Sequence, residues 1–203
     1  MLQREIRYLL AAIQAVVGWE WIVSGINKVL SGTFPQGLAD TLTDGIKGNP
    51  NGWYVSFLQT VVQPNSVFFG YLIEWTEVTI GVALLAGVLL LLFGRPTVRG
   101  QAQHGLYVAF CSAVAVLATI GAFLCVNFHF WMGHGLLPGL GGGPYDEGID
   151  LDALMPPLSL IIMIANLYLV SRLRGAAFFL KRGSLKRGSE PITDMDESAP
   201  SAV

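Results

Sequence analysis

Charged and amide side chains interrupt the long apolar stretches of this 203-residue chain. The first stretch carries Glu20, Ser24 and Lys28, whose spacing of four residues places them on one face of a helix. The second carries Glu74 and Glu77, again one turn apart. An ionisable group within a membrane costs about 2.5 to 3.5 kcal/mol on insertion scales, so each one requires a partner or a function. Groups of these types can transfer protons and bind polar or anionic parts of a substrate.

The remaining polar residues extend this pattern at a similar depth. The third stretch carries Asn127 and His129 close to its end, and His134 follows. We therefore expect a polar cavity in the outer half of a helix bundle, open to the outside or laterally to lipid. Aromatic walls are expected from Trp19, Trp21, Trp75 and Trp131. Lys28 is expected to form an ion pair with Glu74 or Glu77, and Asn166, nearer the inner side, is excluded from the site.

Four helical spans must position these groups. Each apolar stretch meets the roughly 20 residues that a helix needs to cross a bilayer core of about 30 Å, and a lipid environment requires helices because it leaves no partner for free backbone groups. The fold class is thus all-α, a four-helix transmembrane bundle, with glycines allowing close helix contacts. The spans are residues 8–30, 67–93, 106–132 and 154–173, and the glycines are Gly18, Gly25, Gly81, Gly87 and Gly121.

The distribution of basic residues predicts the orientation of the bundle. Of the twelve Lys and Arg residues, all but Lys28 and Lys47 lie before the first span, between the second and third spans, or at and beyond the end of the fourth. Cytoplasmic segments collect positive charge. Both termini are therefore predicted to be cytoplasmic, in a multi-pass protein of the inner (plasma) membrane whose primary partner is the lipid bilayer.

The segments outside the spans differ in character. In residues 31–65, Leu38, Leu42 and Ile46 repeat at helical spacing, which predicts one or two short amphipathic helices on the outer surface. The loop around residues 139–152 is acidic and lacks basic residues. A membrane domain over residues 1–183 and a disordered cytoplasmic tail over residues 184–203 are expected, because the tail is rich in Ser, Pro, Asp and Glu.

Composition argues against several other classes of protein. Only 13% of the residues are charged, against roughly 25% in a soluble domain, and no basic surface suited to nucleic acid is expected. Cys111 and Cys125 are about 21 Å apart along one helix, too far for a disulfide bond. The spacing of the three histidines does not favour a haem or a metal site.

Two short motifs resemble the DoxX/DoxD family of four-span membrane proteins. Gly25 and Lys28 match a G-x-x-K element that closes the first helix. The second helix carries an E-x-x-x-G-x-x-L-x-x-G element from Glu77 to Gly87, and the run of residues 127–130, Asn-Phe-His-Phe, is similar to the DoxD branch. The resemblance covers roughly residues 5–175. It implies the membrane subunit of a quinone-linked oxidoreductase that acts on reduced sulfur compounds such as thiosulfate, working with a second subunit.

The resemblance also implies roles for individual residues, and a non-enzymatic alternative stays open. The implied catalytic residues are Glu77, Lys28 and Glu20, and the implied substrate- or quinone-binding residues are Lys28, Glu74, Asn127, His129 and Trp75. Quinone is the expected electron acceptor. In the alternative, the bundle is a scaffold that docks a soluble redox or stress protein, or supports a larger membrane complex, and the ion pairs are structural. Retention of quinone by the purified protein would distinguish the two.

Overall fold

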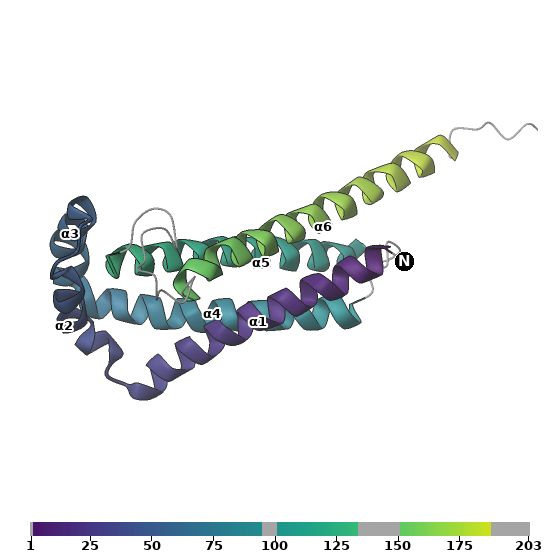
Figure 1. Ribbon diagram of the computed structural model, residues 1–203. Helices are drawn as coiled ribbons and strands as arrows, with labels where there is room; N and C mark the ends of the chain where they lie inside the picture. Colours follow the sequence, from purple (N-terminus) through teal and green to yellow (C-terminus); the bar gives the residue numbers. More distant parts are fainter. Residues whose placement is uncertain (1, 95–100, 134–150, 188–203) are drawn as a thin grey trace, which may run out of the picture.

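The chain folds as a bundle of long helices with shorter helices packed across one end (Figure 1). A computed structural model describes residues 2–94, 101–133 and 151–187. Its long helices are α1 (Leu2–Ser31), α4 (Ser66–Phe93), α5 (Gln101–Trp131) and α6 (Leu151–Arg187). The start of α1 and the end of α6 lie at one end of the bundle, opposite α2 and α3 (Figure 1). The predicted all-α class is confirmed.

Within the described residues, four helical stretches are long and apolar enough to cross a membrane, as the sequence predicts. They are Glu5–Ser31, Gly52–Phe93, His104–Trp131 and Ala153–Gly175. Large apolar side chains such as Val16, Phe68 and Leu106 are exposed on the outside of the bundle. In water these side chains would be costly, whereas a lipid environment accommodates them. This apolar surface and the four long helices support a multi-pass membrane protein.

Glycines bring α1 and α4 into close contact. A Cβ atom added to Gly81 would lie 2.5 Å from the backbone nitrogen of Ile22, and one added to Gly25 would lie 2.6 Å from that of Val78. No larger side chain fits at either position without moving a helix backbone. This is the close approach that small residues permit in membrane bundles. At the far end of the pair, Arg7 donates hydrogen bonds to the carbonyl oxygens of Leu91, in the last turn of α4, and of Gly94, which follows the helix.

The second pair of helices, α5 and α6, packs through an apolar core. Cys111 and Cys125 are both buried and free. Near the middle of the bundle Asn166 on α6 donates to the side-chain oxygen of Gln14 at 3.3 Å. Gln14 in turn donates to the carbonyl oxygen of Leu84 at 2.9 Å. These polar contacts tie α1, α4 and α6 together in the bundle interior.

Short helices cover the α2 end of the bundle. These are α2 (Phe34–Ile46), α3 (Gly52–Phe57), the π-helical turn η1 (Leu58–Val62) and the 3₁₀ turn η2 (Gln63–Asn65). Their buried residues Leu38, Leu42, Tyr54, Leu58 and Val62 form a core of their own with side chains of α4 and α5. The aspartates of α2 are exposed, so the predicted amphipathic helix between the first two spans is confirmed.

Two helix boundaries differ from those expected. The second apolar stretch begins at Gly52 because α3, η1, η2 and α4 follow one another without a break. Pro64 within η2 lacks a backbone donor, and a proline of this kind bends a helix. The last helix, α6, continues to Arg187, past the predicted domain boundary at residue 183. The loop 134–150 and the tail 188–203 lie outside the described residues.

Candidate functional site

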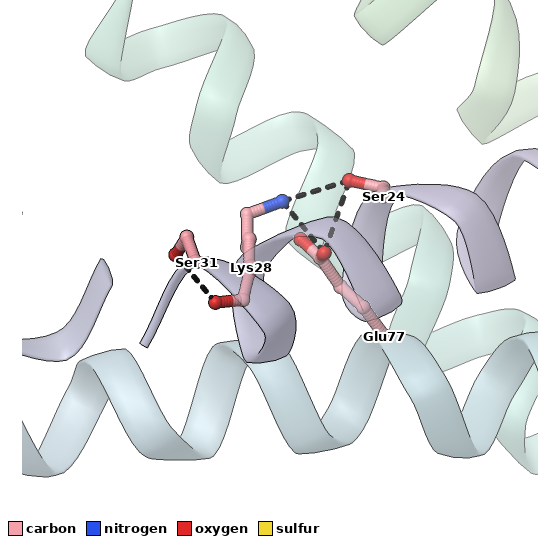
Figure 2. A network of polar contacts seen from close by, with 4 residues as sticks. All are labelled: Ser24, Lys28, Ser31 and Glu77. Carbon is pink, nitrogen blue, oxygen red and sulfur yellow. Dashed lines mark hydrogen bonds and ion pairs between the residues drawn. The ribbon is translucent and has the colours of Figure 1, made fainter. Parts of the chain in front are cut away.

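An ion pair joins α1 and α4 at the bundle end that α2 covers (Figure 2). The Nζ atom of Lys28 lies 2.6 Å from Oε2 of Glu77. Ser24 donates a hydrogen bond to the same oxygen at 3.0 Å and accepts one from Lys28 at 2.7 Å. The three side chains form a closed triangle of polar contacts. Of the two glutamates that the sequence offers to Lys28, the structure selects Glu77.

The two partners of this pair differ in their access to solvent. The Glu77 side chain is 1% exposed, whereas that of Lys28 is 23% exposed. Lys28 lies in the last turn of α1, where a cation is favoured by the helix dipole. Its Nζ atom also lies 5.4 Å from the ring centroid of Phe34, a distance typical of a cation–π contact. The Lys28 side chain therefore contacts Glu77, Ser24 and the Phe34 ring.

The ion pair forms part of the wall of a cavity of about 620 Å³. This volume falls within the range of about 300 to 1,000 Å³ that is usual for ligand sites. The cavity extends from α1 across to α5 beneath the short helices. Most of its wall is apolar or aromatic, including Trp21, Tyr54, Phe69, Phe128 and Trp131. Polar groups contribute at few points, so the cavity suits a largely apolar ligand with a small polar part.

A second hollow of about 460 Å³ adjoins the cavity beside α2. Its wall is more polar. Asn27, Ser31 and Thr33 line this hollow and do not line the first cavity. The two hollows share Ser24, Lys28, Phe34 and Thr41. We call the second hollow the vestibule. Lys28 thus stands between a polar compartment and an apolar one.

Four of the seven site residues predicted from the sequence line the cavity. They are Glu20, Lys28, Glu77 and Asn127. Glu20 is partly exposed, two turns before Lys28 on α1. Asn127 accepts hydrogen bonds from the hydroxyl of Tyr54, at 2.9 Å on its carbonyl oxygen and at 3.2 Å on its side-chain oxygen. Its amide donates to the carbonyl oxygen of Phe123. Asn127 therefore links α3 to α5 through hydrogen bonds and also lines the cavity.

The other three predicted residues, Glu74, Trp75 and His129, are not among the described residues that line the cavity. Glu74 is buried on the face of α4 that carries Gly70 and Gly81. Trp75 is exposed on the outside of α4 and is not among the cavity-lining residues. His129 is buried in α5. His134 lies outside the described residues.

Several residues that the sequence analysis left out contribute to the structure of this end. Asn49 donates hydrogen bonds to the carbonyl oxygens of Phe130 and Trp131, at 2.9 and 3.0 Å, and so satisfies the end of α5. Thr41 and Thr76 line the cavity. The excluded Asn166 is buried and bonded to Gln14, away from the cavity. The sequence feature that could have pointed to Asn49 is the run of Asn and Gly residues directly before the aromatic segment at Trp53.

Two further observations bear on the chemistry. Within the described residues, no group of three or more His, Cys, Asp or Glu side chains is placed to hold a metal ion. A second ion pair, between Asp44 in the last turn of α2 and Lys47 just after it, is exposed, and the hydrogen bond and charge of Asp44 raise the pKa of Lys47. Exposed pairs of this kind contribute little to stability.

Comparison with known proteins adds no relative. No protein-family model, no curated protein and no solved structure matches this chain.

Proposed function

We propose that this protein is a DoxX/DoxD-like membrane subunit that binds quinone and delivers to it the electrons of a reduced sulfur compound such as thiosulfate. The observation that supports the proposal is the cavity of about 620 Å³, apolar over most of its wall and lined at one side by Lys28, Ser24 and Glu77. A quinone has this same division, an apolar ring and tail with two carbonyl oxygens. The family assignment rests on the short motifs of the first two spans.

The proposed reaction balances without a group bound permanently to this chain. Two thiosulfate anions joined by a new S–S bond release two electrons, and quinone takes up two electrons and two protons to become quinol. Lys28 donates a hydrogen bond to a quinone carbonyl oxygen, and Glu77 and Glu20 pass protons toward it. Asn127 offers a further polar contact on the wall. The place where the donor is oxidised is assigned to a second subunit or soluble partner protein.

The proposed location follows from the charge distribution. The protein lies in the inner (plasma) membrane with both termini in the cytoplasm, which places α2, α3 and the vestibule on the outer side. In this orientation the electron donor approaches from outside, while quinone is supplied from the bilayer.

Quinone retention by the purified protein tests the proposal. Protein in lipid nanodiscs is extracted, and bound quinone is measured per molecule of protein. Thr76→Trp places an indole against the cavity wall, whereas Thr79→Trp on the same helix is exposed and outside the lining. Overpacking of this kind costs about 1 to 3 kcal/mol. Because about 1.4 kcal/mol is tenfold in affinity, we expect Thr76→Trp to bind quinone about five- to a hundredfold more weakly and to retain correspondingly less of it. Thr79→Trp should retain the wild-type amount.

A scaffold role is the second candidate, and one observation favours it. The Lys28–Ser24–Glu77 triangle satisfies its own charges and ties α1 to α4 without any ligand. A scaffold would use this contact for stability alone. Wild-type protein that carries no quinone from native membranes, and takes up none when quinone is added, would refute the oxidoreductase proposal and leave the scaffold.

A further inference from the structure

The cavity is not closed on the side where α4 meets α5. Leu72 on α4 and Ile120 and Phe123 on α5 line the cavity and are exposed on the outside of the bundle as well. Leu72 is 49% exposed and Phe123 is 65% exposed. With Thr76 of α4, these three residues form what we call the α4–α5 gap. All but the threonine are large and apolar, as a surface in contact with lipid requires.

The packing of the bundle explains why the gap is located there. Towards the end of the bundle away from α2, α4 and α5 are in direct contact. A Cβ atom added to Gly87 of α4 would lie 3.4 Å from the Val114 side chain of α5. At the α2 end no glycine of α4 faces α5. There Gly70 is packed against Pro35 of α2, and Gly81 against Ile22 of α1. The small residues hold α4 to α1 and α2, so α4 and α5 are separated by large side chains and by the cavity itself.

If the last residue of α5, Trp131, marks the outer edge of the apolar layer, the gap lies within that layer. Ile120 and Phe123 precede Trp131, the last residue of α5, by about 12 to 17 Å at the rise of 1.5 Å per helical residue. The apolar core of a bilayer is about 30 Å thick. An opening at this depth meets lipid chains rather than water.

The polar end of the cavity wall and the α4–α5 gap are carried by different helices. Lys28 and Ser24 on α1 border the vestibule, whereas the α4–α5 gap borders lipid. A ligand that fills both sides therefore has a polar head directed to α1 and an apolar chain directed between α4 and α5. Its chain has no need to fold back within the cavity.

We propose that the α4–α5 gap is the passage for the isoprenoid tail of a long-chain quinone, which reaches the cavity sideways from the bilayer with its ring toward Lys28. This inference rests on the proposed function and defines its substrate class: the physiological acceptor is a membrane-dissolved, long-tailed quinone. A tail-less quinone can reach the ring position through the vestibule and makes no use of the gap. The residues of the gap therefore discriminate between quinones by the presence of the isoprenoid tail and not by the structure of the ring.

A comparison of two quinones with the same ring, one with a long isoprenoid tail and one without a tail, tests the passage. The dissociation constant of each is measured by equilibrium binding to the full-length protein in nanodiscs. Ile120→Trp narrows the gap. Val116→Trp is the control, one turn away on the same helix, exposed and outside the cavity lining. We expect Ile120→Trp to weaken binding of the long-tailed quinone about tenfold, within the range of overpacking costs, and to leave the tail-less quinone unchanged.

The outcomes separate the two proposals. If the wild-type protein binds neither quinone, the proposed function fails and the passage fails with it. If it binds the long-tailed quinone and Ile120→Trp changes neither constant, or both equally, the passage alone is overturned. A long-tailed quinone with a photoreactive diazirine in its tail gives a second measurement on the unmodified chain. Cross-links at the α4–α5 gap support the passage, and cross-links confined to other helices refute it.

Discussion

The Lys28–Glu77 ion pair gives the sharpest test of the structure. Lys28→Met removes one partner and leaves the Glu77 carboxylate, 1% exposed, with Ser24 as its remaining donor in the triangle. Glu77→Gln removes the other partner and leaves Lys28, which is 23% exposed and borders the vestibule. The lysine can therefore move its charge toward solvent, whereas the glutamate cannot.

This asymmetry sets the expected magnitudes. Removing one member of a buried pair costs about 3 to 5 kcal/mol, and we expect Lys28→Met at the lower end of that range because the lysine is partly exposed. Glu77→Gln keeps the shape of the side chain and loses only the charge, so the loss of a hydrogen bond to a charged group, about 1.5 to 3 kcal/mol, is expected. The double variant should be more stable than Lys28→Met alone, which requires a coupling energy larger than the cost of Glu77→Gln, about 1.5 to 3 kcal/mol.

The assay is reversible unfolding of the purified protein in mixed micelles, followed by helical circular dichroism as the fraction of dodecyl sulfate rises. All four members of the cycle are measured under the same conditions. The exposed pair provides the control, since Lys47→Met and Asp44→Asn should add without coupling. If the costs of Lys28→Met and Glu77→Gln are simply additive, the ion pair does not contribute and the inference drawn from its geometry is wrong.

Two further predictions concern helix packing and orientation. Gly81→Leu should destabilise the bundle by at least about 1 to 3 kcal/mol, because its side chain would meet the α1 backbone. A side chain added at Gly37 on α2 would point into open space, so Gly37→Leu should change the unfolding midpoint in dodecyl sulfate little. If Gly37→Leu and Gly81→Leu lowered the midpoint equally, the close contact between Gly81 and α1 would be contradicted. In intact cells an impermeant thiol reagent should label Asp40→Cys and not Glu5→Cys, both exposed positions, since the native cysteines are buried. The opposite labelling would reverse the predicted orientation.

The number and approximate limits of the spans are determined by the sequence alone. Hydrophobic length and helical periodicity are local properties, so the four apolar stretches and the amphipathic α2 follow directly from the order of residues. The same reasoning identifies Gly25 and Gly81 as positions of close contact, which the structure confirms. Local pattern does not reveal that α3 runs through η1 and η2 into α4, because that path depends on how the short helices pack across the bundle.

The membership of the cavity is decided by the tertiary structure. Glu74 and Glu77 are one turn apart on one helix face, so the sequence offers both to Lys28, and only the position of α1 against α4, held by its glycines, brings Glu77 within 2.6 Å. Asn127 and His129 differ by two residues, which is about 200° of rotation at 3.6 residues per turn. Asn127 consequently lines the cavity whereas His129 is buried elsewhere on α5. Depth in the membrane can be read from the chain, but the direction that a side chain faces requires the neighbouring helices.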